Sequence, residues 1–216
     1  EARVQALTKL RQSIKEQLRM EAAWLQAQIH PHFLFNTLNT IASLGVIDTT
    51  RMLKLLEEFG NYLRRSFDVH NTESLVPIEN ELDLTRSYLY IEKERFENRL
   101  HIKWEIEDDL DFKVPPLSIQ PIVENAVEHG VLKRVNGGTI CIRIIRYEKY
   151  YRIAVTDDGV GMEQEKIEQI LNEHPSKVAG VGVANTNRRL KKLYGKGLVI
   201  ESKVDEPKSY EDYDVN

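Results

Sequence analysis

Two histidines flank a proline in the segment LQAQIHPHFLFNTLNTIASL, residues 25–44. A neutral imidazole is nucleophilic near pH 7, so His30 or His32 is a candidate acceptor for a transferred chemical group. Because successive residues of a helix are turned by about 100°, the two rings lie on opposite sides. They therefore cannot serve one functional face or share a metal ion, and the sequence raises the question of which histidine is reactive.

A polar stripe on an otherwise apolar helix distinguishes His32. The stripe continues four, seven and eleven residues later with Asn36, Asn39 and Ser43. The side of His30 instead carries Leu34, Thr37 and Ile41. Inside a helix Pro31 costs about 3 kcal/mol or more, because its ring crowds the preceding turn and it lacks an N–H. The stripe and the proline favour a functional His32; the alternative is that both histidines fill or cap a kinked bundle.

An aspartate and two glycines follow a strand-like run in VTDDGVGM, residues 155–162. The alternating apolar residues Ile153 and Val155 predict a strand that ends at Asp157. At that position the carboxylate of Asp157 can accept a hydrogen bond from an exocyclic amine. Gly159 and Gly161 let the backbone turn tightly beside a ligand. Turns explain most short glycine pairs, so this segment gains weight only in combination with others.

Two further segments complete a possible nucleotide site. In GVGVANTNRRL, Gly180 and Gly182 immediately precede a helix, whose free N–H groups and positive dipole end suit phosphate oxygens. In PPLSIQPIVENAVEHGV, Glu124 and Asn125 lie on an amphipathic helix, and carboxylate and amide oxygens suit Mg²⁺. The alternative for this last helix is a core element whose polar side chains are merely solvated.

The composition narrows the classes of function. The chain has 216 residues, of which 41% are hydrophobic, enough for one compact domain and a smaller element. A formal net charge of −4 disfavours nucleic acid as a partner. The single cysteine, Cys141, excludes a disulfide framework and a cysteine-based zinc site. No apolar run approaches 18 residues and no signal peptide is apparent, so this portion is expected neither to span a membrane nor to be exported.

The elements that position these residues begin with a helical hairpin. Apolar residues from Val4 to Ile29 recur with a mean spacing of roughly 3.57, which predicts a long helix paired with a second copy of the chain. Gly45 ends the His32 helix, and Asp48 or the following Thr49 can N-cap the next. That next helix, over about 49–67, is predicted to bury Met52, Leu53, Leu56, Phe59 and Leu63. Two such hairpins would form a four-helix bundle in a parallel homodimer.

Beyond a boundary at about residues 68–76, the pattern becomes mixed α/β. The predicted helices cover residues 78–97, 117–132, 163–171 and 182–194. The predicted strands cover residues 100–106 and 198–203, with a two-strand hairpin over 138–157 that turns near Glu148 and Lys149. This order predicts an α/β sandwich with helices on one face of the sheet.

Four segments in this order make the chain resemble the sensor histidine kinases of the LytS/YehU type over about residues 20–200. QIHPHFLFNTLN is similar to the phosphoacceptor segment, ENAVEHG to the N box, DDGVGM to the first glycine box and GVGVANTNRRLKKLYG to the second. The resemblance implies an α+β fold, in which a helical hairpin forms a dimeric four-helix bundle and precedes a Bergerat-type (GHKL) α/β sandwich. Residues 1–70 would serve dimerisation and histidine phosphotransfer, and residues 71–216 would bind ATP.

By the same resemblance, His32 would take the γ-phosphoryl group of ATP and pass it to an aspartate in the receiver domain of a response regulator. Asn36 would orient a water for dephosphorylating that regulator, and Glu124 is a distant candidate for the general base. The implied partners are a second copy of the chain and the regulator, without nucleic acid. The resemblance also implies the cytoplasmic portion of a plasma-membrane sensor, with its sensing region upstream.

The resemblance assigns the nucleotide-binding residues one by one. Asn125 would hold Mg²⁺, and Asp157 would read the adenine amino group. Glycines would line both ends of the nucleotide, Gly159 and Gly161 at the adenine and Gly180 and Gly182 at the phosphates. The segment 163–179 would form a mobile lid in which Lys177 contacts phosphate.

The sequence departs from the family pattern in three places. Many relatives have Asn at the position of His30, which leaves His30 as a minor alternative acceptor. Phe33 follows His32 where other kinase groups place an acidic residue. The C-terminal tail lacks the Gly-Thr-x-Val strand that usually closes this domain; truncation and divergence are the two explanations, and under truncation the sheet would be one strand short. Two rival functions stay open: a nucleotide-gated conformational ATPase of the same superfamily, and a dimerisation module with a degenerate nucleotide site.

Overall fold

The computed structural model describes residues 31–68, 75–171, 181–202 and 208–211. Predictions on the long N-terminal stripe, His30, Lys177 and Gly180 lie outside these ranges, as does the turn of Ala27 that Pro31 is predicted to crowd. Within the described ranges, no helix has the combination of length and apolar character that crossing a bilayer requires.

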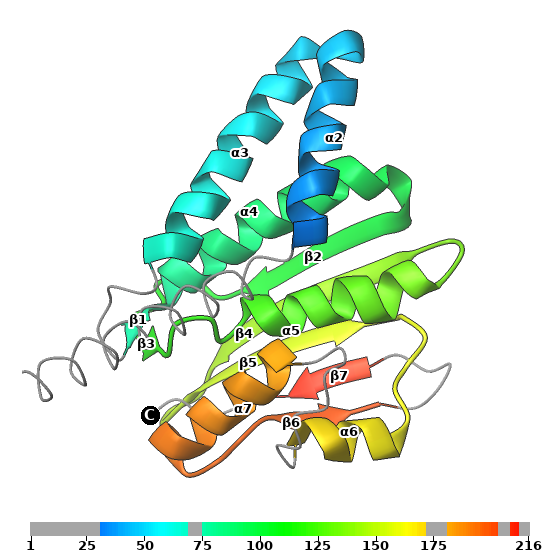
Figure 1. The fold of residues 1–216 in the computed structure, drawn as a ribbon. Coiled ribbons are helices and arrows are strands. Elements are labelled where there is room, and N and C mark those ends of the chain that lie inside the picture. The colour runs from blue at the N-terminus through cyan, green and yellow to red at the C-terminus, as the bar shows by residue number, and fades with distance from the viewer. Residues whose placement is uncertain (1–30, 69–74, 172–180, 203–207, 212–216) are drawn as a thin grey trace, which may run out of the picture.

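A helical hairpin opens the described chain and projects from one end of the molecule (Figure 1). Helix α2 spans Pro31–Ile47 and helix α3 spans Thr49–Asp68. Asp48 alone separates them, and its Oδ1 accepts the N–H of Arg51 at 3.0 Å, which caps the first turn of α3. The predicted hairpin is confirmed, and of the two capping candidates Asp48 is the cap. The prediction that Gly45 ends the first helix is wrong, because α2 continues to Ile47.

The buried side of the hairpin differs in part from the predicted one. Helix α3 buries Leu55, Phe59 and Tyr62. The prediction that Leu53 and Leu56 are buried is wrong for the single chain, where they remain 57% and 48% exposed. The physical reason is that α3 packs lengthwise against helix α4, so the side facing α4 and α2 becomes the buried one.

Helix α4, Ile78–Phe96, leads through the short 3₁₀ turn η2, Glu97–Arg99, into strand β2, Leu100–Ile106. Both α4 and β2 match their predicted ranges closely. Two very short strands, β1 at Val76–Pro77 and β3 at Lys113–Val114, pair antiparallel beside the start of α4. Strands of two residues carry no usable alternation, and the sequence did not predict this pair.

The main sheet has the strand order β2-β4-β5-β7-β6. Strands β4, Gly138–Arg146, and β5, Tyr151–Asp157, form the predicted antiparallel hairpin, and β2 runs parallel to β4. Strand β6 spans Val199–Glu201. The sheet is not one strand short, because β7, Lys208–Glu211, pairs antiparallel with both β5 and β6. Backbone groups make this pairing, so a divergent tail closes the sheet without the family tetrapeptide.

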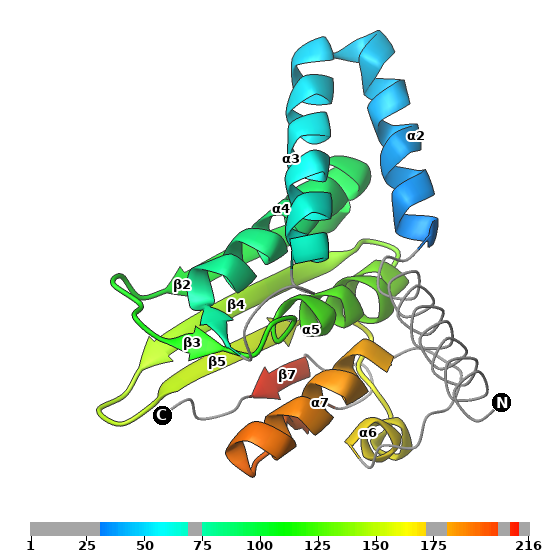
Figure 2. The ribbon, with the colours of Figure 1, turned by 60° about the vertical axis from the view of Figure 1, so that its left-hand side comes forward.

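Helices cover one face of this sheet, as predicted. Helix α5, Gln120–Asn125, continues as the wider turn η3, Ala126–Gly130, and the 3₁₀ turn η4, Val131–Lys133. Helix α6 spans Gln164–Leu171 and helix α7 spans Val181–Tyr194. Helix α5 contacts α4 on one side and α7 on the other (Figure 2). Ile140, Ile142 and Ile144 of β4 are buried against this layer, whereas Arg143 between them is exposed.

Candidate nucleotide and phosphoacceptor site

Asp157 ends β5 in a position that only glycines can surround. Its side chain is 2% exposed, and Oδ1 accepts the N–H of Gly159 at 2.9 Å. A Cβ on Gly130 would lie 2.4 Å from Asp157 Oδ1, and one on Gly159 would lie 2.3 Å from the carbonyl carbon of Gly130. The first glycine box and the end of the α5–η3 segment are therefore pressed together around one carboxylate.

The two neighbouring aspartates have different tasks. Asp158 pairs with β4, since its Oδ1 accepts the N–H of Thr139 at 2.6 Å and its own N–H donates to the Thr139 carbonyl at 3.2 Å. Asp157, and not Asp158, is therefore the aspartate that lies against Gly130 and Gly159. Gly161 has a φ of +77°, a left-handed conformation that favours glycine and turns the chain away from β5.

Helix α5 brings the remaining predicted segments together. Asn125 is buried on α5, and Glu124 beside it is half-buried. Gly182, in the first turn of α7, lies against the same helix, where an added Cβ would be 3.0 Å from Pro121 Cβ. The continuous α5–η3 segment thus contacts the Asp157 segment at its far end, in η3, and the second glycine box near its beginning, in α5.

The donor set fits a magnesium ion that is held mainly by a nucleotide. The described residues contain no group of three or more His, Cys, Asp or Glu side chains arranged to hold a metal. Mg²⁺ commonly takes only one or two protein ligands and otherwise binds waters and substrate phosphates. The buried amide oxygen of Asn125 suits that limited role.

A buried glutamate that sequence reasoning missed fixes where α5 begins. Glu81 of α4 accepts three backbone N–H groups just before α5, from Leu117 at 2.6 Å, Ser118 at 2.8 Å and Ile119 at 3.1 Å. Leu117 has a φ of +56°, an uncommon conformation for a side chain of its kind. Glu81 therefore holds a strained turn and orients the helix that carries Asn125, but a buried glutamate looks the same in sequence as an exposed one.

Replacing Glu81 by Gln is expected to lower the free energy of unfolding by about 2 kcal/mol. The amide would present N–H groups to backbone N–H groups and leave buried donors without an acceptor. Urea unfolding followed by circular dichroism measures the change. Glu79→Gln, an exposed glutamate two residues earlier, is the matched control, and equal stability of the two variants would contradict the assignment.

Asn187 of α7 was also missed, and it ties together the elements around the second glycine box. Its Nδ2 donates to the carbonyl of Leu171 at the end of α6, at 3.0 Å. Its Oδ1 accepts the N–H of Leu198, which precedes β6, at 2.9 Å. Asn187 is fully buried, so its amide has a structural role that could not be recognised from its place in the glycine-box motif.

His32 lies in the first turn of α2, exposed to solvent. Its Nε2 lies 3.0 Å from Nδ2 of Asn36, one helical turn later. Asn39 and Ser43 of the predicted polar stripe are exposed as well. Because an amide nitrogen can only donate, Nε2 accepts this hydrogen bond with its one lone pair, and the ring proton lies on Nδ1.

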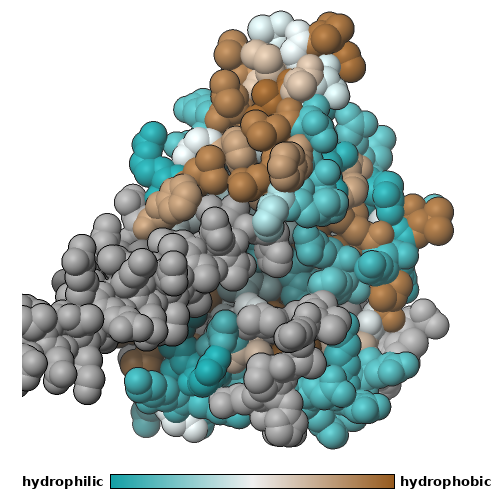
Figure 3. Space-filling model, viewed as in Figure 1, coloured by the Kyte–Doolittle hydropathy of each residue, from teal (hydrophilic) through white to brown (hydrophobic). Residues whose placement is uncertain are grey.

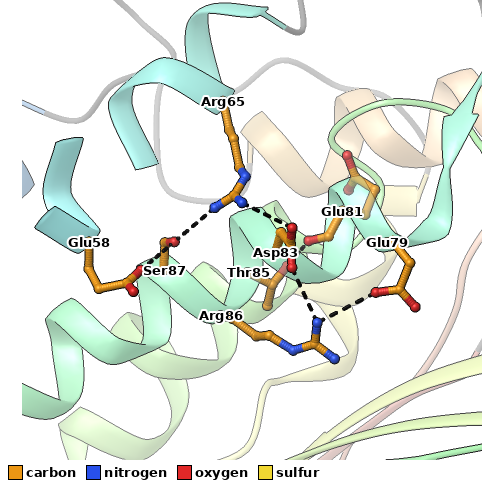
Figure 4. A network of polar contacts seen from close by, with 8 residues as sticks. All are labelled: Glu58, Arg65, Glu79, Glu81, Asp83, Thr85, Arg86 and Ser87. Carbon is orange, nitrogen blue, oxygen red and sulfur yellow. Dashed lines mark hydrogen bonds and ion pairs between the residues drawn. The ribbon is translucent and has the colours of Figure 1, made fainter. Parts of the chain in front are cut away.

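The residue after His32 anchors the hairpin to α4. The ring of Phe33 packs against Tyr62 of α3 and Tyr88 of α4, with centroid distances of 5.1 Å and 5.4 Å. A polar network continues this interface along α3 and α4 (Figure 4), in which Arg65 contacts Asp83 and Ser87. Ser87 in turn donates to Glu58 at 2.8 Å. The hairpin is thus docked onto the helical layer of its own chain.

Three carboxyl groups gather where α4 and α5 face each other beneath this anchor. Burial, together with the charges of Glu128 and Glu92, raises the pKa of Glu124 to about 8. Burial also raises the pKa of Glu92 to about 7, against the opposing effect of Arg95, whose guanidinium lies 3.3 Å away. Tyr88, which contacts Phe33, has its pKa raised by burial and by the same three carboxylates.

Glu92 should make the stability of the protein depend on pH. Its pKa is raised in the folded state from about 4.5, so its contribution is fully present below pH 4.5 and is lost as the pH rises through about 7. The contribution of Glu92 to the unfolding free energy is expected to fall by about 2 kcal/mol between about pH 5.5 and about pH 7.5, in addition to the fall that Glu124 contributes. Glu92→Gln should flatten this part of the profile, and the exposed Glu107→Gln should not. Parallel profiles for wild type and Glu92→Gln would contradict the prediction.

Two protein-family models match the chain in succession. A model described as histidine kinase matches residues 20–100. A model described as histidine kinase-, DNA gyrase B- and HSP90-like ATPase matches residues 116–211, which include Asn125, Asp157 and both glycine pairs. The second match implies ATP binding by this part of the chain.

Relatives with similar sequences include YwpD of Bacillus subtilis, 45% identical over 94% of this chain and 73% of its own length. The sensor protein LytS of Bacillus anthracis is 38% identical over 84% of this chain. The sensor histidine kinase YpdA of Escherichia coli is 36% identical over 89% of this chain. The chain spans only 32% and 35% of the lengths of LytS and YpdA, respectively.

Solved structures agree in fold. The histidine kinase domain of a blue-light activated kinase from Erythrobacter litoralis superposes with a TM-score of 0.50 at 14% identity, covering 91% of this chain and 95% of that one. A bacterial phosphotransferase gives a TM-score of 0.52 at 11% identity, covering 89% of this chain and 93% of that one. The helical N-terminal part followed by a GHKL-type α/β unit is thus an arrangement shared with these two structures. With the family models and the LytS-like relatives, it follows that the chain belongs to the LytS-type sensor histidine kinases and is a protein histidine kinase core.

Proposed function

We propose that this chain phosphorylates itself on His32 with ATP and passes the phosphoryl group to an aspartate in the receiver domain of a response regulator. The observation that carries the proposal is an exposed imidazole, with Asn36 at Nε2, in a turn anchored to the helical layer that includes α5. His30 lies outside the described residues and remains the alternative acceptor.

The proposed chemistry is an in-line phosphoryl transfer. Once the hydrogen bond from Asn36 is released, the lone pair of His32 Nε2 forms a bond to the γ-phosphorus, and the bond from that phosphorus to the β,γ-bridging oxygen breaks. ADP leaves with that electron pair, and the proton on Nδ1 departs to a base or to water. No acidic residue lies within α2, so Glu124 of α5 remains the proposed proton acceptor, acting in its ionised form, which the raised pKa makes more basic. The phosphohistidine then donates the same group to the regulator's carboxylate.

The proposed nucleotide site uses the residues around α5. Asp157 would accept from the adenine amino group beside Gly159 and Gly161, where an added side chain has no room at Gly159. Asn125 would hold Mg²⁺, which neutralises phosphate charge during transfer. Gly182 would lie at the phosphates, and the resemblance adds Gly180 and Lys177 there.

A homodimer is the proposed assembly. Large apolar side chains are exposed on the hairpin, and Figure 3 shows apolar surface gathered there: Phe35, Leu38, Val46, Ile47, Leu53 and Leu56. Such a contiguous apolar surface is typical of an interface, and a second hairpin would complete a four-helix bundle. We also propose that residues 1–70 serve dimerisation and phosphotransfer, and that the chain is the cytoplasmic portion of a membrane-anchored sensor.

Phosphate labelling tests the central proposal. The wild-type chain, incubated with γ-labelled ATP and Mg²⁺, should acquire label that is lost in acid and stable in base, as expected for a phosphohistidine. A receiver domain added afterwards should take over the label. ATP turnover without any such label would instead favour the nucleotide-gated conformational ATPase, and no ATP binding at all would favour a degenerate module.

Asn36→Ala is expected to slow dephosphorylation of the regulator roughly tenfold or more, while self-phosphorylation continues. The amide stands one turn from His32, where it can orient a water once the histidine is unmodified. The decay of a phosphorylated receiver domain in the presence of each variant measures this. Asn39→Ala, on the same exposed stripe, is the matched control, and an unaltered decay rate with Asn36→Ala would remove Asn36 from this role.

A further inference from the structure

Helix α2 presents three different sides. One side is buried within the chain and consists of Phe33, Thr37 and Leu44. A second side is exposed and polar and consists of His32, Asn39 and Ser43. A third side is exposed and apolar and includes Phe35, Leu38 and Val46. Docking onto the same chain and pairing with a second copy therefore use separate surfaces and do not compete.

The buried side fixes the turn that carries His32. Phe33 directly follows His32, is 2% exposed, and lies between Tyr62 and Tyr88, whose own ring centroids are 6.3 Å apart. Aromatic contacts at such distances are directional as well as apolar. A change in the position of Tyr62 would therefore shift Phe33 and the imidazole beside it.

Tyr62 also reaches the helix of the nucleotide site. Nε2 of Gln120 donates to the Tyr62 hydroxyl at 3.3 Å, and both side chains are buried. Gln120 is the first residue of α5, and Asn125 is near the end of the same short helix. A single tyrosine thus contacts both the neighbour of His32 and the helix assigned to Mg²⁺ and phosphates, all within one chain.

We propose that Phe33, Tyr62 and Gln120 are positioning residues that seat His32 beside the nucleotide site of its own chain, so that the phosphoryl group moves within one subunit. This inference rests on the proposed function of His32 and Asp157. The bond from the γ-phosphorus to its bridging oxygen breaks and the bond to Nε2 forms on the same polypeptide; ADP leaves with the electron pair, and the Nδ1 proton passes to water or a carboxylate.

Heterodimers with different affinity tags decide between transfer within and between subunits. The first pairs a His32→Gln subunit with an Asp157→Asn subunit. The second pairs a wild-type subunit with one that carries both substitutions. Transfer within a subunit predicts no label in the first heterodimer and about half of the wild-type label in the second. Label in the first heterodimer, whether or not the second is labelled, would overturn the proposal.

If the subunits of a dimer separate, dilution of the protein distinguishes transfer within a chain from transfer between chains. A chain that labels itself should keep the same rate per chain at all protein concentrations, whereas transfer between chains slows on dilution. If the wild-type chain gives no phosphohistidine in any arm, the proposed function itself fails. A normally labelled wild type with label in the first heterodimer refutes only the inference drawn here.

Substitutions at the docking contact test the positioning role. Tyr62→Phe and Gln120→Leu should each lower the labelling rate at saturating ATP by about threefold to tenfold, the worth of one neutral hydrogen bond, with ATP affinity unchanged. The double variant should lose no more than Tyr62→Phe alone, because Tyr62→Phe already removes the bond to Gln120 together with the hydroxyl's contact with Ser66. Tyr90→Phe, elsewhere on α4, is the matched control. Losses that multiply in the double variant, or that appear equally in ATP affinity, would overturn the assignment.

Discussion

A His32→Gln chain should acquire no acid-labile label from γ-labelled ATP, a loss on the order of a thousandfold or more, because the nucleophile itself is removed. Glutamine has nearly the reach of histidine and can still meet Asn36, but its amide nitrogen is not nucleophilic. The ring of His32 is exposed and the buried anchor is its neighbour Phe33, so the variant should fold and bind ATP normally.

Two histidine controls make this result interpretable. His101→Gln alters an exposed histidine on β2, far along the chain from the hairpin, and should label like wild type. His30→Gln removes the other candidate in the segment and should keep most of the label. If label survived His32→Gln but disappeared with His30→Gln, the assignment of the acceptor would reverse. Label that survived both changes would place the phosphate elsewhere.

The periodicity of the apolar residues predicted most of the helices and strands, because an element that is buried on one face has apolar residues at a regular spacing. In β4, buried Ile140, Ile142 and Ile144 alternate with less buried residues, and the strand is found where the alternation is. Helix α4 and strand β2 were found for the same reason. The glycine pair at Gly159 and Gly161 also followed from local chemistry, because a crowded turn has few other solutions.

What the sequence did not predict depends on contacts between distant segments. Glu81 became a buried acceptor only because the turn before α5 folds onto α4, and nothing local in the sequence marks that. Tyr62 and Gln120, 58 residues apart, meet for the same reason. Strand β7 was missed since backbone hydrogen bonds hold a polar segment whose residues do not alternate clearly.

The side of α3 that is buried was missed for a different reason. Leucines and aromatic residues surround much of this helix, so several faces were plausible core faces. Contact with α4 selected the side of Leu55 and Tyr62 and left Leu53 and Leu56 exposed. Those exposed leucines belong to the apolar surface proposed for the dimer, so one helix has two apolar sides with different partners.

Asp157→Asn is expected to weaken ATP binding roughly a hundredfold while leaving the fold intact. The Asn carbonyl oxygen can still accept the N–H of Gly159, which Asp157 Oδ1 accepts at 2.9 Å. The second position, however, changes from an acceptor to an NH₂ donor and would face the adenine amino group, also a donor. Loss of a hydrogen bond to a charged group costs about 1.5–3 kcal/mol, and the donor–donor contact adds to this.

The same reversal should change the preferred base. Hypoxanthine carries a 6-oxo acceptor where adenine carries an amino donor, so Asp157→Asn should bind inosine triphosphate better relative to ATP than wild type does. Titration calorimetry with both nucleotides measures the ratio, and Asp158→Asn is the matched control because Asp158 is held by Thr139 of β4. A uniform loss for both nucleotides would mean that Asp157 supports the local backbone without reading the base. A shift in the ratio would identify its carboxylate as the group that selects adenine, since the two bases differ only on the edge formed by the 6-substituent and the adjacent N1, where donor and acceptor are exchanged.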